Sequence, residues 1–592
     1  MMNQGFSTDV QLINVASQGD LHNMADFPYG MALITAYLRE QGFKTLMLQN
    51  PTWKNEEYIK KIIDNPAYLY GFQIGLENYV DVNDLVKLIK QNNPNAKIIF
   101  GGPFVVSIYK ELLRIDPNLD AVVLGEGEYT IAELIKLLKE GSPDWKLIRG
   151  LAWLDDKGDV VVNPHRTAIQ DMDAMPYAAR DGIKEGEHDI EGTYMHDARI
   201  TTSRGCTSNC TFCAVNINSK LQNTKRWRGR DPILVVDEIE ELVKEYNVKM
   251  INFQDSAFDD PGRVGVERTK IICEEILKRG LEISIKIFHR ANPIKEDPES
   301  IELYKLYKEA GIDVIIIGVE AGSSYELELY GKTATVEDNY RCFRVLRELD
   351  LFFNHVGIIM FGPYTTFSTL RANYKFLYEN QLFYWYHNID SSLILGPGAA
   401  MHDIIKKEGR LISRSNIWEY PDYEFESPEI LKLAQHYQHI RPIYPHIDVG
   451  NPLVLKVENI ISRLKNKMNR KIAVGCEQEI IKFKENYYKN KNAINELAYS
   501  GVTEILERVE KDGLKADLVK ASEPYFGESW GTAIYEIEEG YMNILSSIKE
   551  KGFGLGGVVF NAELTKMEQR TNNLENMKSR DRSGSLSVQT TI

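Results

Sequence analysis

Long apolar segments are missing from this 592-residue sequence. About 18 apolar residues in a row are needed to indicate a membrane-spanning helix, and no such stretch occurs. The opening residues, Met1 to Asp9, also lack the positively charged and apolar regions of a secretory signal peptide. Both absences predict a soluble, cytoplasmic protein without a membrane span.

Excess positive charge is missing as well, since 70 Lys and Arg residues stand against 85 Asp and Glu residues, giving a formal net charge of -15. Binding to nucleic acid needs a basic footprint on the protein surface. The composition therefore predicts no nucleic-acid partner, although a local basic patch remains compatible with it.

Cysteine is scarce, with six residues in the whole chain. That is too few for a disulfide framework in a protein of this size. Cys273, Cys342 and Cys476 stand far apart in the sequence. Because no second group of thiols exists to hold one, we expect no auxiliary iron-sulfur cluster.

The other three cysteines form a motif, in which Cys206, Cys210 and Cys213 have C-x-x-x-C-x-x-C spacing. Three thiolates in one loop can complete a zinc site with a distant ligand such as His196. They can also hold three irons of a 4Fe-4S cluster and leave the fourth iron open, or remain buried free thiols. Spacing alone leaves all three readings open. Phe212, between the last two cysteines, and a predicted strand over 198–202 favour the cluster.

Residues 8 to about 140 alternate short apolar strands with amphipathic helices, which predicts a doubly wound, mostly parallel sheet. The expected strands are 10–15, 44–48, 68–74, 97–100 and 121–124, with helices at 30–41 and 82–91. Ligands of such sheets bind beyond the carboxyl ends of the strands, where glycine lets a backbone come close. The residues expected there are Gly101, Gly102, Gly125, Glu126 and Gly127.

A second α/β unit is predicted from residue 200 onward. Six strands are expected, at 200–203, 249–253, 283–287, 314–319, 355–360 and 391–395, with helices between them. Six units rather than eight imply an open barrel with its site at the carboxyl ends of the strands.

The expected organisation has an α/β fold class throughout the first two domains and helices after them. The predicted boundaries are 1–147 for the Rossmann-like domain, 148–197 for a connector with a hairpin, 198–400 for the barrel, 401–565 for a helical accessory domain and 566–592 for a disordered tail. Aromatic residues at 383–386, 418, 420, 423 and 425 are expected to pack in the core rather than line a substrate chamber. His436, His439 and His446 are expected to be solvated or hydrogen-bonded rather than to bind a metal.

The cysteine motif resembles that of the radical S-adenosylmethionine (radical SAM) enzymes. The segments Pro28 to Ala32, Ile98 to Pro103 and Val123 to Glu128, taken together, resemble the cobalamin-binding domain that precedes many radical SAM cores. The joint resemblance covers residues 8 to about 400 and implies three cofactors: a 4Fe-4S cluster, SAM and cobalamin. A Rossmann-like domain that has lost its ligand is the alternative interpretation of the first unit.

The resemblance also implies roles for residues at the strand ends. Phe212 would lie near the adenine of SAM, Asp255 would contact the SAM amino group or the substrate, and Arg290 would meet the SAM carboxylate. Gly318 and Glu320 belong to a motif whose carboxylate accepts hydrogen bonds from the ribose. Gly357 lies in the segment expected beside adenine.

Cobalt ligation is a separate question. Asp20-Leu-His22 partly matches the D-x-H-x-x-G motif of cobalamin-dependent mutases, but Ala25 replaces the glycine. Radical SAM relatives usually lack this ligand, so the resemblance predicts cobalt without a nitrogen from His22.

The activity implied by the resemblance is carbon methylation. In the family, an electron passes through the cluster to SAM, and the resulting 5'-deoxyadenosyl radical removes hydrogen from an unactivated substrate carbon. Methylcobalamin then delivers a methyl group, and a second SAM regenerates it. A natural-product intermediate, a peptide or a lipid would fit as substrate, with a reductase such as flavodoxin or ferredoxin as electron donor. Cyclisation or rearrangement without methyl transfer, and an iron-sulfur sensor without turnover, are the alternatives.

Overall fold

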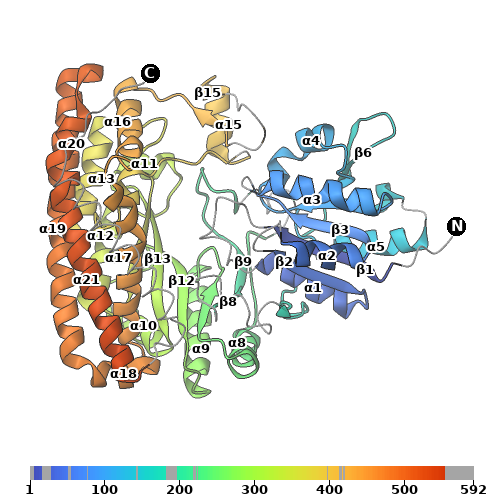
Figure 1. Ribbon diagram of the computed structural model, residues 1–592, viewed down its shortest axis with the longest axis horizontal. Coiled ribbons are helices and arrows are strands. Elements are labelled where there is room, and N and C mark those ends of the chain that lie inside the picture. Colours follow the sequence, from blue (N-terminus) through green and yellow to red (C-terminus); the bar gives the residue numbers. More distant parts are fainter. Residues whose placement is uncertain are drawn as a thin grey trace.

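The computed structural model describes residues 6–15, 28–50, 55–75, 78–141, 144–181, 197–215, 217, 222, 225–396, 398–412, 417 and 420–553. Figure 1 shows three bodies side by side: an α/β domain, a partial barrel in the middle and a layer of long helices on the far side. The order of the three bodies follows the chain, as the colours show.

The first domain is built on a seven-stranded sheet of order β2-β1-β3-β4-β5-β6-β7. The strands are β1 (Thr8–Val15), β2 (Thr45–Asn50), β3 (Ala67–Gln73), β4 (Lys97–Gly101), β5 (Ala121–Val123), β6 (Leu151–Leu154) and β7 (Val160–Val162). The helices are α1 (Tyr29–Glu40), α2 (Glu56–Asp64), α3 (Tyr79–Asn92), α4 (Val105–Ile115) and α5 (Glu128–Glu140). Strands β1 to β5 pair in parallel, and helices cover both faces, which is why these strands are apolar almost throughout. The predicted doubly wound sheet is confirmed.

The hairpin that we assigned to the connector belongs to this sheet. β6 pairs antiparallel with β5, and β7 pairs with β6. Leu151 and Ala152 are fully buried in the domain core. The physical reason is that β5 would otherwise be an exposed edge strand with unpaired backbone groups. The sheet of the first domain therefore extends to Val162, past the predicted boundary at residue 147.

The barrel contains a five-stranded parallel sheet of order β14-β13-β12-β11-β8. Its strands are β8 (Asp197–Ile200), β11 (Met250–Phe253), β12 (Ser284–Arg290), β13 (Ile312–Glu320) and β14 (Phe353–Ile358), and a short hairpin joins β9 (Ser203–Gly205) to β10 (Trp227–Gly229). The helices of this unit are α8 (Pro232–Tyr246), α9 (Gly262–Lys278), α10 (Pro298–Glu309), α11 (Ser324–Leu329), α12 (Val336–Leu349), α13 (Phe367–Glu379) and α14 (His387–Asp390). Two of these helices begin with an Asp cap followed by Pro, at Asp231 and Asp297, a combination that favours a sharp helix start.

The sixth predicted barrel strand, 391–395, is not a strand. It makes one isolated parallel bridge, between Phe361 and Ser392. Pro363, two residues after Phe361, supplies no backbone donor, and Gly396 lies at the end of the 391–395 segment. The pairing of the two segments therefore ends after this bridge. The prediction of an open barrel holds, with five strands and a bridge.

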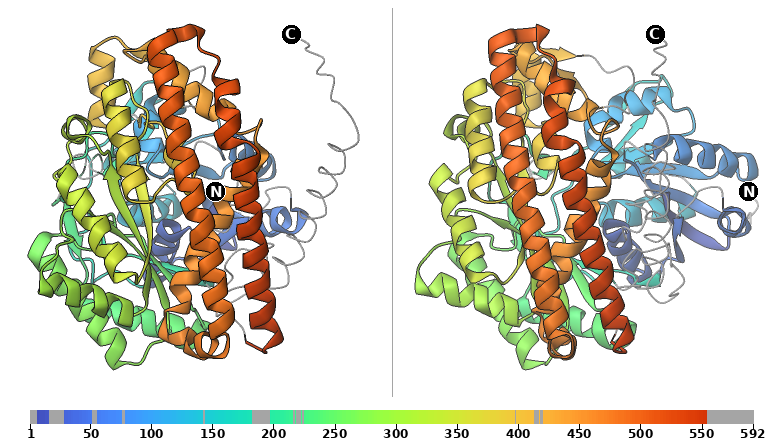
Figure 2. Two further views of the ribbon diagram at one scale, coloured as in Figure 1. Left: turned by 90° about the vertical axis from the view of Figure 1, so that its left-hand side faces the viewer. Right: turned by 60° about the vertical axis from the view of Figure 1, so that its left-hand side comes forward.

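Helices dominate the chain after the barrel, as predicted. A small unit comes first, with α15 (Ala400–Lys407), β15 (Leu411–Ile412) and β16 (Asp422–Tyr423). The bundle follows, with α16 (Pro428–His439), α17 (Pro445–Leu464), α18 (Arg470–Gly475), α19 (Glu477–Asp512), α20 (Leu518–Phe526) and α21 (Glu528–Glu550). α19 packs against α13 of the barrel and against α20 and α21, and Figure 2 shows α19 and α21 running side by side along the molecule. Among the helices that the structure describes, none has the length and apolar character needed to cross a bilayer.

Candidate active site

The three clustered cysteines follow β9, in the segment that leads to β10. Gly205 ends β9 with a φ of 88°, and a side chain at this position would meet the carbonyl oxygen of Arg226 at 1.8 Å. Cys206, Cys210 and Cys213 are all partly exposed, whereas the remaining cysteines are buried. The hairpin thus starts a loop that presents three accessible thiols.

Two anchors hold this loop. After Cys206, Thr207 donates its backbone N–H and its hydroxyl to Asp260, at 2.9 and 2.6 Å. After Cys210, Thr211 donates its backbone N–H to the carbonyl of Tyr330 at 2.9 Å. The ring of Phe212 meets the ring of Tyr330 edge-on, with centroids 5.6 Å apart. The loop is therefore tied to the segments that follow β11 and α11.

The donor set of the loop fits an iron-sulfur cluster. It supplies three partly exposed thiols, which is the number that a 4Fe-4S cluster with one open iron requires, because each thiolate binds a different iron. Burial raises the pKa of the Cys210 thiol to about 11, and the charge of Lys332 only partly opposes this. Loading with iron must therefore release protons.

Glu320, Gly318 and Gly357 lie together beside this loop. Gly318 pairs with Gly357 across β13 and β14, and the register shifts between Gly318 and Glu320. A side chain at Gly318 would lie 2.7 Å from Oε1 of Glu320, and one at Gly357 would lie 4.0 Å from Oε2. The two glycines thus leave space around the carboxylate. Glu320 also acts through space on Cys210, which brings the predicted ribose-binding group next to the cysteines.

Lys332 is a member of this site to which the sequence analysis gave no role. Its Nζ donates to the carbonyl of Gly318 at 2.9 Å and lies 3.4 Å from Oε1 of Glu320. Burial raises the pKa of Glu320, and the charge of Lys332 opposes that rise. Lys332 follows Glu320 by 12 positions, with the short helix α11 between them. This spacing after a strand-end Glu is the sequence signal that could have indicated the pair.

Asp255 and Arg290 both have partners within the chain, and their predicted contacts with SAM stay predictions. Asp255 is 2% exposed and accepts hydrogen bonds from the backbone N–H of Thr202, the Thr202 hydroxyl and the hydroxyl of Ser203. Its carboxylate therefore fixes the end of β8. Three donors satisfy much of this buried carboxylate, and its predicted contact with SAM or substrate stays a prediction.

Arg290 is engaged by carboxylates of its own chain. Its guanidinium lies 2.8 Å from Asp259 and 2.7 Å from Asp260. Burial alone would raise the pKa of Asp259, but the charges of His289 and Arg290 lower it overall. Asp260 also accepts a hydrogen bond from Thr207. Arg290 therefore helps to hold the cysteine loop through its ion pair with Asp260.

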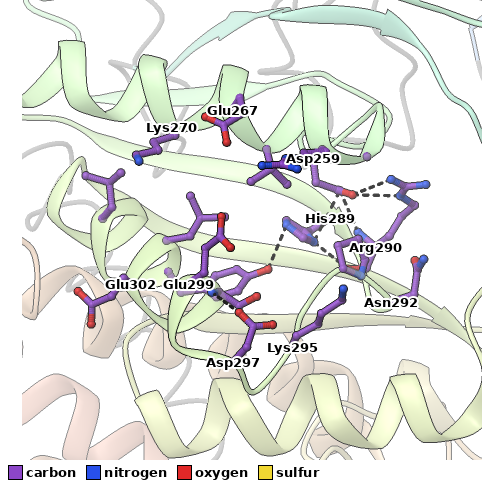
Figure 3. Close-up of a pocket in the computed structure, with 18 of the residues that line it drawn as sticks. Asp259, Glu267, Lys270, His289, Arg290, Asn292, Lys295, Asp297, Glu299 and Glu302 are labelled. Atoms are coloured by element: carbon purple, nitrogen blue, oxygen red, sulfur yellow. Dashed lines mark hydrogen bonds and ion pairs between the residues drawn. The ribbon is translucent and has the colours of Figure 1, made fainter.

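These residues border a pocket of about 880 Å³ between α9 and α10. Thr207, Asp259, His289 and Arg290 line one side of it, and charged residues of the two helices line the rest. Figure 3 shows Arg290 joined to Asp259 at one end and Glu299 and Glu302 at the other. Glu320, Gly318 and Gly357 are not among its lining residues, so this pocket is separate from the predicted ribose site.

Two glycines at the carboxyl edge of the first sheet leave room for a cofactor to come close. A side chain added at Gly75, after β3, or at Gly101, at the end of β4, would meet no atom within 4 Å. Gly102 has a φ of 117°, a conformation that favours glycine. Cobalamin could approach the backbone at these positions, and the residues present thus fit the group.

The Gly125 to Glu128 turn, however, links the first domain to the barrel. Glu126 lies 2.8 Å from Arg228 and 3.1 Å from Arg204, and it accepts the backbone N–H of Ile169 at 2.7 Å. Glu128 pairs with Arg204 at 2.9 Å. These donors engage both oxygens of Glu126, and its predicted contact with a cofactor stays a prediction. We name Glu126, Glu128, Arg204 and Arg228 the interdomain ion network.

The two glycines of this turn face protein rather than open space. A side chain at Gly125, which has a φ of 91°, would collide with the amide of Gln222 at 2.6 Å. One at Gly127 would meet Ile34 of the same domain at 3.1 Å. Gly125 therefore permits close contact between the domains, and Gly127 permits packing inside the first domain.

The expectation for the C-terminal histidine residues is confirmed, and that for the aromatic residues holds only in part, because Tyr420 is 44% exposed. Phe383, Tyr384, Tyr386 and Tyr423 are buried. His436 Nε2 lies 2.7 Å from the Ser522 hydroxyl, His446 Nε2 lies 2.7 Å from the carbonyl of Phe526, and His439 is exposed. Residues 16–27, which include His22, and His196, Trp418 and the 566–592 tail lie outside the described residues.

Comparisons with known proteins agree with both halves of the site. The radical SAM superfamily model matches residues 200–377, and the B12 binding domain model matches residues 12–135. An uncharacterized methyltransferase of Pyrococcus horikoshii is 30% identical over 353 residues, which cover 59% of this chain and 72% of that protein.

Two other relatives extend the comparison. The anaerobic magnesium-protoporphyrin IX monomethyl ester cyclase of Cereibacter sphaeroides is 31% identical over 306 residues, covering 50% of this chain and 47% of the cyclase. The solved structure of the cobalamin-dependent S-adenosylmethionine radical enzyme OxsB, with aqua-cobalamin and S-adenosylmethionine bound, shares the fold with a TM-score of 0.66. The match is 20% identical and covers 92% of this chain and 79% of that chain. This chain therefore belongs to the radical SAM enzymes that carry a cobalamin-binding domain, and its cofactors are a 4Fe-4S cluster, SAM and cobalamin.

Proposed function

We propose that this enzyme transfers a methyl group to an unactivated carbon of a small-molecule, peptide or lipid substrate. The interdomain ion network is the observation that carries the proposal. Arg204 lies two residues before Cys206 and pairs with Glu126 and Glu128, which follow β5 at the carboxyl edge of the first sheet. This contact supports a chamber shared by the cobalamin edge and the cysteine loop, as methyl transfer between cofactor and substrate requires.

Different residues of the chain would bind the different cofactors. Cys206, Cys210 and Cys213 would hold the cluster, and Glu320, which lies 3.4 Å from Lys332, would accept hydrogen bonds from the ribose of SAM. Gly101 and Gly102 would line the cobalamin site. When bound, SAM with the cluster supplies a radical that removes hydrogen, and cobalamin supplies the methyl group. A flavodoxin or ferredoxin in the cytoplasm would supply the electrons.

The decisive experiment uses SAM labelled in its methyl group. The reconstituted enzyme would be incubated anaerobically with cobalamin, reductant, labelled SAM and an extract of the producing cells, and products would be identified by mass spectrometry. Appearance of labelled product that depends on both cobalamin and the cluster is expected. A product that requires cobalamin but carries no label would overturn methyl transfer.

Cyclisation or rearrangement is the second candidate, because one relative at 31% identity is named a cyclase. The chain covers 47% of that protein, so the cyclase name bears on less than half of its length. An unlabelled, cobalamin-dependent product would establish this candidate instead.

Metal content tests the cofactor assignment independently of turnover. Three partly exposed thiols and three buried ones lead us to expect one cluster, hence close to four irons per chain after anaerobic reconstitution. Ser replacements of Cys273, Cys342 and Cys476 should keep that value. About eight irons, or stoichiometric zinc without iron, would contradict the assignment.

A further inference from the structure

Lys332 is a buried cation whose place in the site is fixed by the backbone of β13. Its side chain is 10% exposed, and its Nζ donates to the carbonyl of Gly318 at 2.9 Å and lies 3.4 Å from Oε1 of Glu320. A side chain at Gly318 would lie 3.5 Å from this Nζ. The glycine therefore leaves the ammonium room to reach the carbonyl, and this hydrogen bond keeps Lys332 beside Glu320.

The turn before Lys332 packs against the cysteine loop. A side chain at Gly331 would lie 2.8 Å from the carbonyl oxygen of Asn209 and 3.4 Å from the methyl carbon of Thr211. Asn209 and Thr211 are the two sequence neighbours of Cys210. The backbone that carries Lys332 is thus held against the loop, next to its middle cysteine.

Two charges of opposite sign act on Cys210. Burial raises the pKa of its thiol most strongly. Of the two charges, Lys332 lowers this pKa and Glu320 raises it, and the effect of Lys332 is the larger. The ion pair therefore acts on the loop mainly through its positive partner, and it stabilises negative charge there.

Arg290, the cation that is tied to the loop through Asp260, is compensated more fully. Its guanidinium pairs with both Asp259 and Asp260, so two carboxylates stand against one positive charge. Within the part of the chain that the structure describes, Lys332 forms an ion pair with Glu320 alone. The positive charge that acts on the cysteine loop is therefore chiefly that of Lys332.

A buried charge at this place affects how readily an electron is accepted. The reduction potential of an iron-sulfur cluster depends on the net charge, the hydrogen bonds and the solvent exposure around it. Charges act more strongly through a protein interior than through water, because the effective dielectric constant is lower. An ammonium beside a cluster cysteine should therefore stabilise the added electron, and a carboxylate should destabilise it.

We propose that Lys332 eases one-electron reduction of the cluster held by the three loop cysteines, and that Glu320 opposes it. The proposal rests on the proposed function only in assigning these cysteines to the cluster. The electron comes from an external reductant and stays on the cluster, so no bond forms or breaks in this step. Lys332 thus allows the carboxylate that would accept the ribose to stand beside the cluster without hindering its reduction.

Redox potentiometry measures this effect without turnover. The holoenzyme, reconstituted with cluster and cobalamin but given no SAM, would be poised anaerobically at a series of potentials, and electron paramagnetic resonance would report the reduced cluster. At a fixed potential, Lys332→Met should lower the ratio of reduced to oxidised cluster about tenfold, a shift of about 59 mV for one electron. Glu320→Gln should raise the ratio by about threefold, and Lys332→Arg should behave as the wild type does. Because SAM is absent, failure of methyl transfer would leave this measurement unaffected.

The opposite signs separate an effect of charge from a structural one. The double variant, Lys332→Met with Glu320→Gln, removes both charges and should lie between the two single variants. Lys278→Met is the matched control, because Lys278 also pairs with a glutamate but is 75% exposed on α9, and its potential should equal that of the wild type.

Iron analysis shows whether each variant retains its cluster. A fully loaded Lys332→Met variant with the wild-type potential would overturn the proposal, and so would shifts of the same sign in Lys332→Met and Glu320→Gln. If Lys332→Met does not load iron, Lys332→Gln takes its place, and a potential in Glu320→Gln that is not raised overturns the proposal by itself.

Discussion

Glu320 combines an unusual backbone with an unusual environment. Its φ is 69°, in the left-handed region that residues with a side chain rarely adopt. The register shift in β13 and the carbonyl of Gly318, held by Lys332, accompany this conformation. Strain of this kind persists where the surrounding structure enforces it, and it is concentrated at functional sites. The conformation keeps the carboxylate next to the cysteine loop.

The first prediction concerns Glu320→Gln. The variant keeps the size of the side chain but loses the charge that would accept hydrogen bonds from SAM, so SAM should bind about ten- to a hundredfold more weakly, equivalent to about 1.5–3 kcal/mol. Equilibrium binding of SAM to the reconstituted protein measures this. Glu328→Gln, exposed on the adjacent helix α11, is the control and should bind SAM normally. Wild-type affinity in Glu320→Gln would refute the ribose assignment.

The second prediction uses a pair of glycines with the same backbone angle. Gly331 and Gly280 both have a φ of 64°. A side chain at Gly331 would lie 2.8 Å from the carbonyl oxygen of Asn209 in the cysteine loop, whereas one at Gly280 meets no atom within 4 Å. Gly331→Ala should lower iron retention after reconstitution, and Gly280→Ala should cost only the backbone strain of about 1–2 kcal/mol. Equal iron contents in the two variants would show that the contact does not position the loop.

Single residues also show where sequence reasoning reached its limit. The motifs identified Glu320, Gly318, Gly357 and the cysteines, which the fold brings together. Asp255, Arg290 and Glu126 were assigned by position at strand ends, but position does not reveal the partner. Each forms ion pairs or hydrogen bonds with residues far away in the chain. Buried carboxylates must find donors, and which donors they find depends on tertiary structure.

At the scale of elements, periodicity predicted most strands within a few residues, and the exceptions have physical causes. The 391–395 segment is apolar enough for a strand, but its backbone hydrogen bonds to the neighbouring segment are concentrated around Phe361. The N–H of Phe361 donates to the carbonyl of Ser391 at 2.9 Å, and the N–H of Leu393 donates to the carbonyl of Phe361 at 2.7 Å. We assigned the hairpin 151–162 to the connector because its sequence does not indicate which strand it pairs with.

The third prediction concerns pH and helix α16. His436 is buried, and burial lowers its pKa from 6.5 to about 4, helped by His439 and Lys432. Between these two pH values the unfolded chain binds a proton that the folded chain does not, so stability falls as the pH drops from 6.5 toward 4. The loss from this one group is about 3 kcal/mol.

Urea unfolding under anaerobic conditions at pH 7.5, 6.0 and 5.0 measures this effect. His436→Gln should lose less stability than the wild type over this range, although it is less stable at pH 7.5 if the bond to Ser522 is weakened. His439→Gln, exposed on the same helix, should follow the wild type. Parallel pH profiles of wild type and His436→Gln would refute the assignment.

At the scale of the whole molecule, the interdomain ion network fixes the first domain against the barrel. Glu126 and Arg228 are 17% and 9% exposed, so their charges are largely removed from solvent. Burial alone would raise the pKa of Glu126, but the hydrogen bonds of Arg228 and the charge of Arg204 lower it overall. An unpaired arginine at this interface would be costly.

The fourth prediction follows from that cost. Glu126→Gln should destabilise the folded protein by about 1.5–3 kcal/mol and expose the linker between the domains to proteases. Glu133→Gln is the control. The Glu133 side chain, which pairs with Arg166, is 46% exposed, and such surface pairs contribute about 1 kcal/mol or less to stability. Denaturant unfolding and limited proteolysis measure the two variants. A smaller loss in Glu126→Gln than in Glu133→Gln would argue against the network.

The central position of the barrel has a consequence for how such enzymes diversify. The first domain and the long helices flank the barrel on opposite sides (Figure 1), and α19 packs on α13 at the outer surface of the barrel. The helical flank nevertheless shares one apolar core with the barrel, and Ser462 of α17 accepts a hydrogen bond from Lys308 of α10 through its backbone carbonyl at 2.9 Å. Exchange of the helical flank between homologues should therefore succeed only when the residues that it buries against the barrel are exchanged with it.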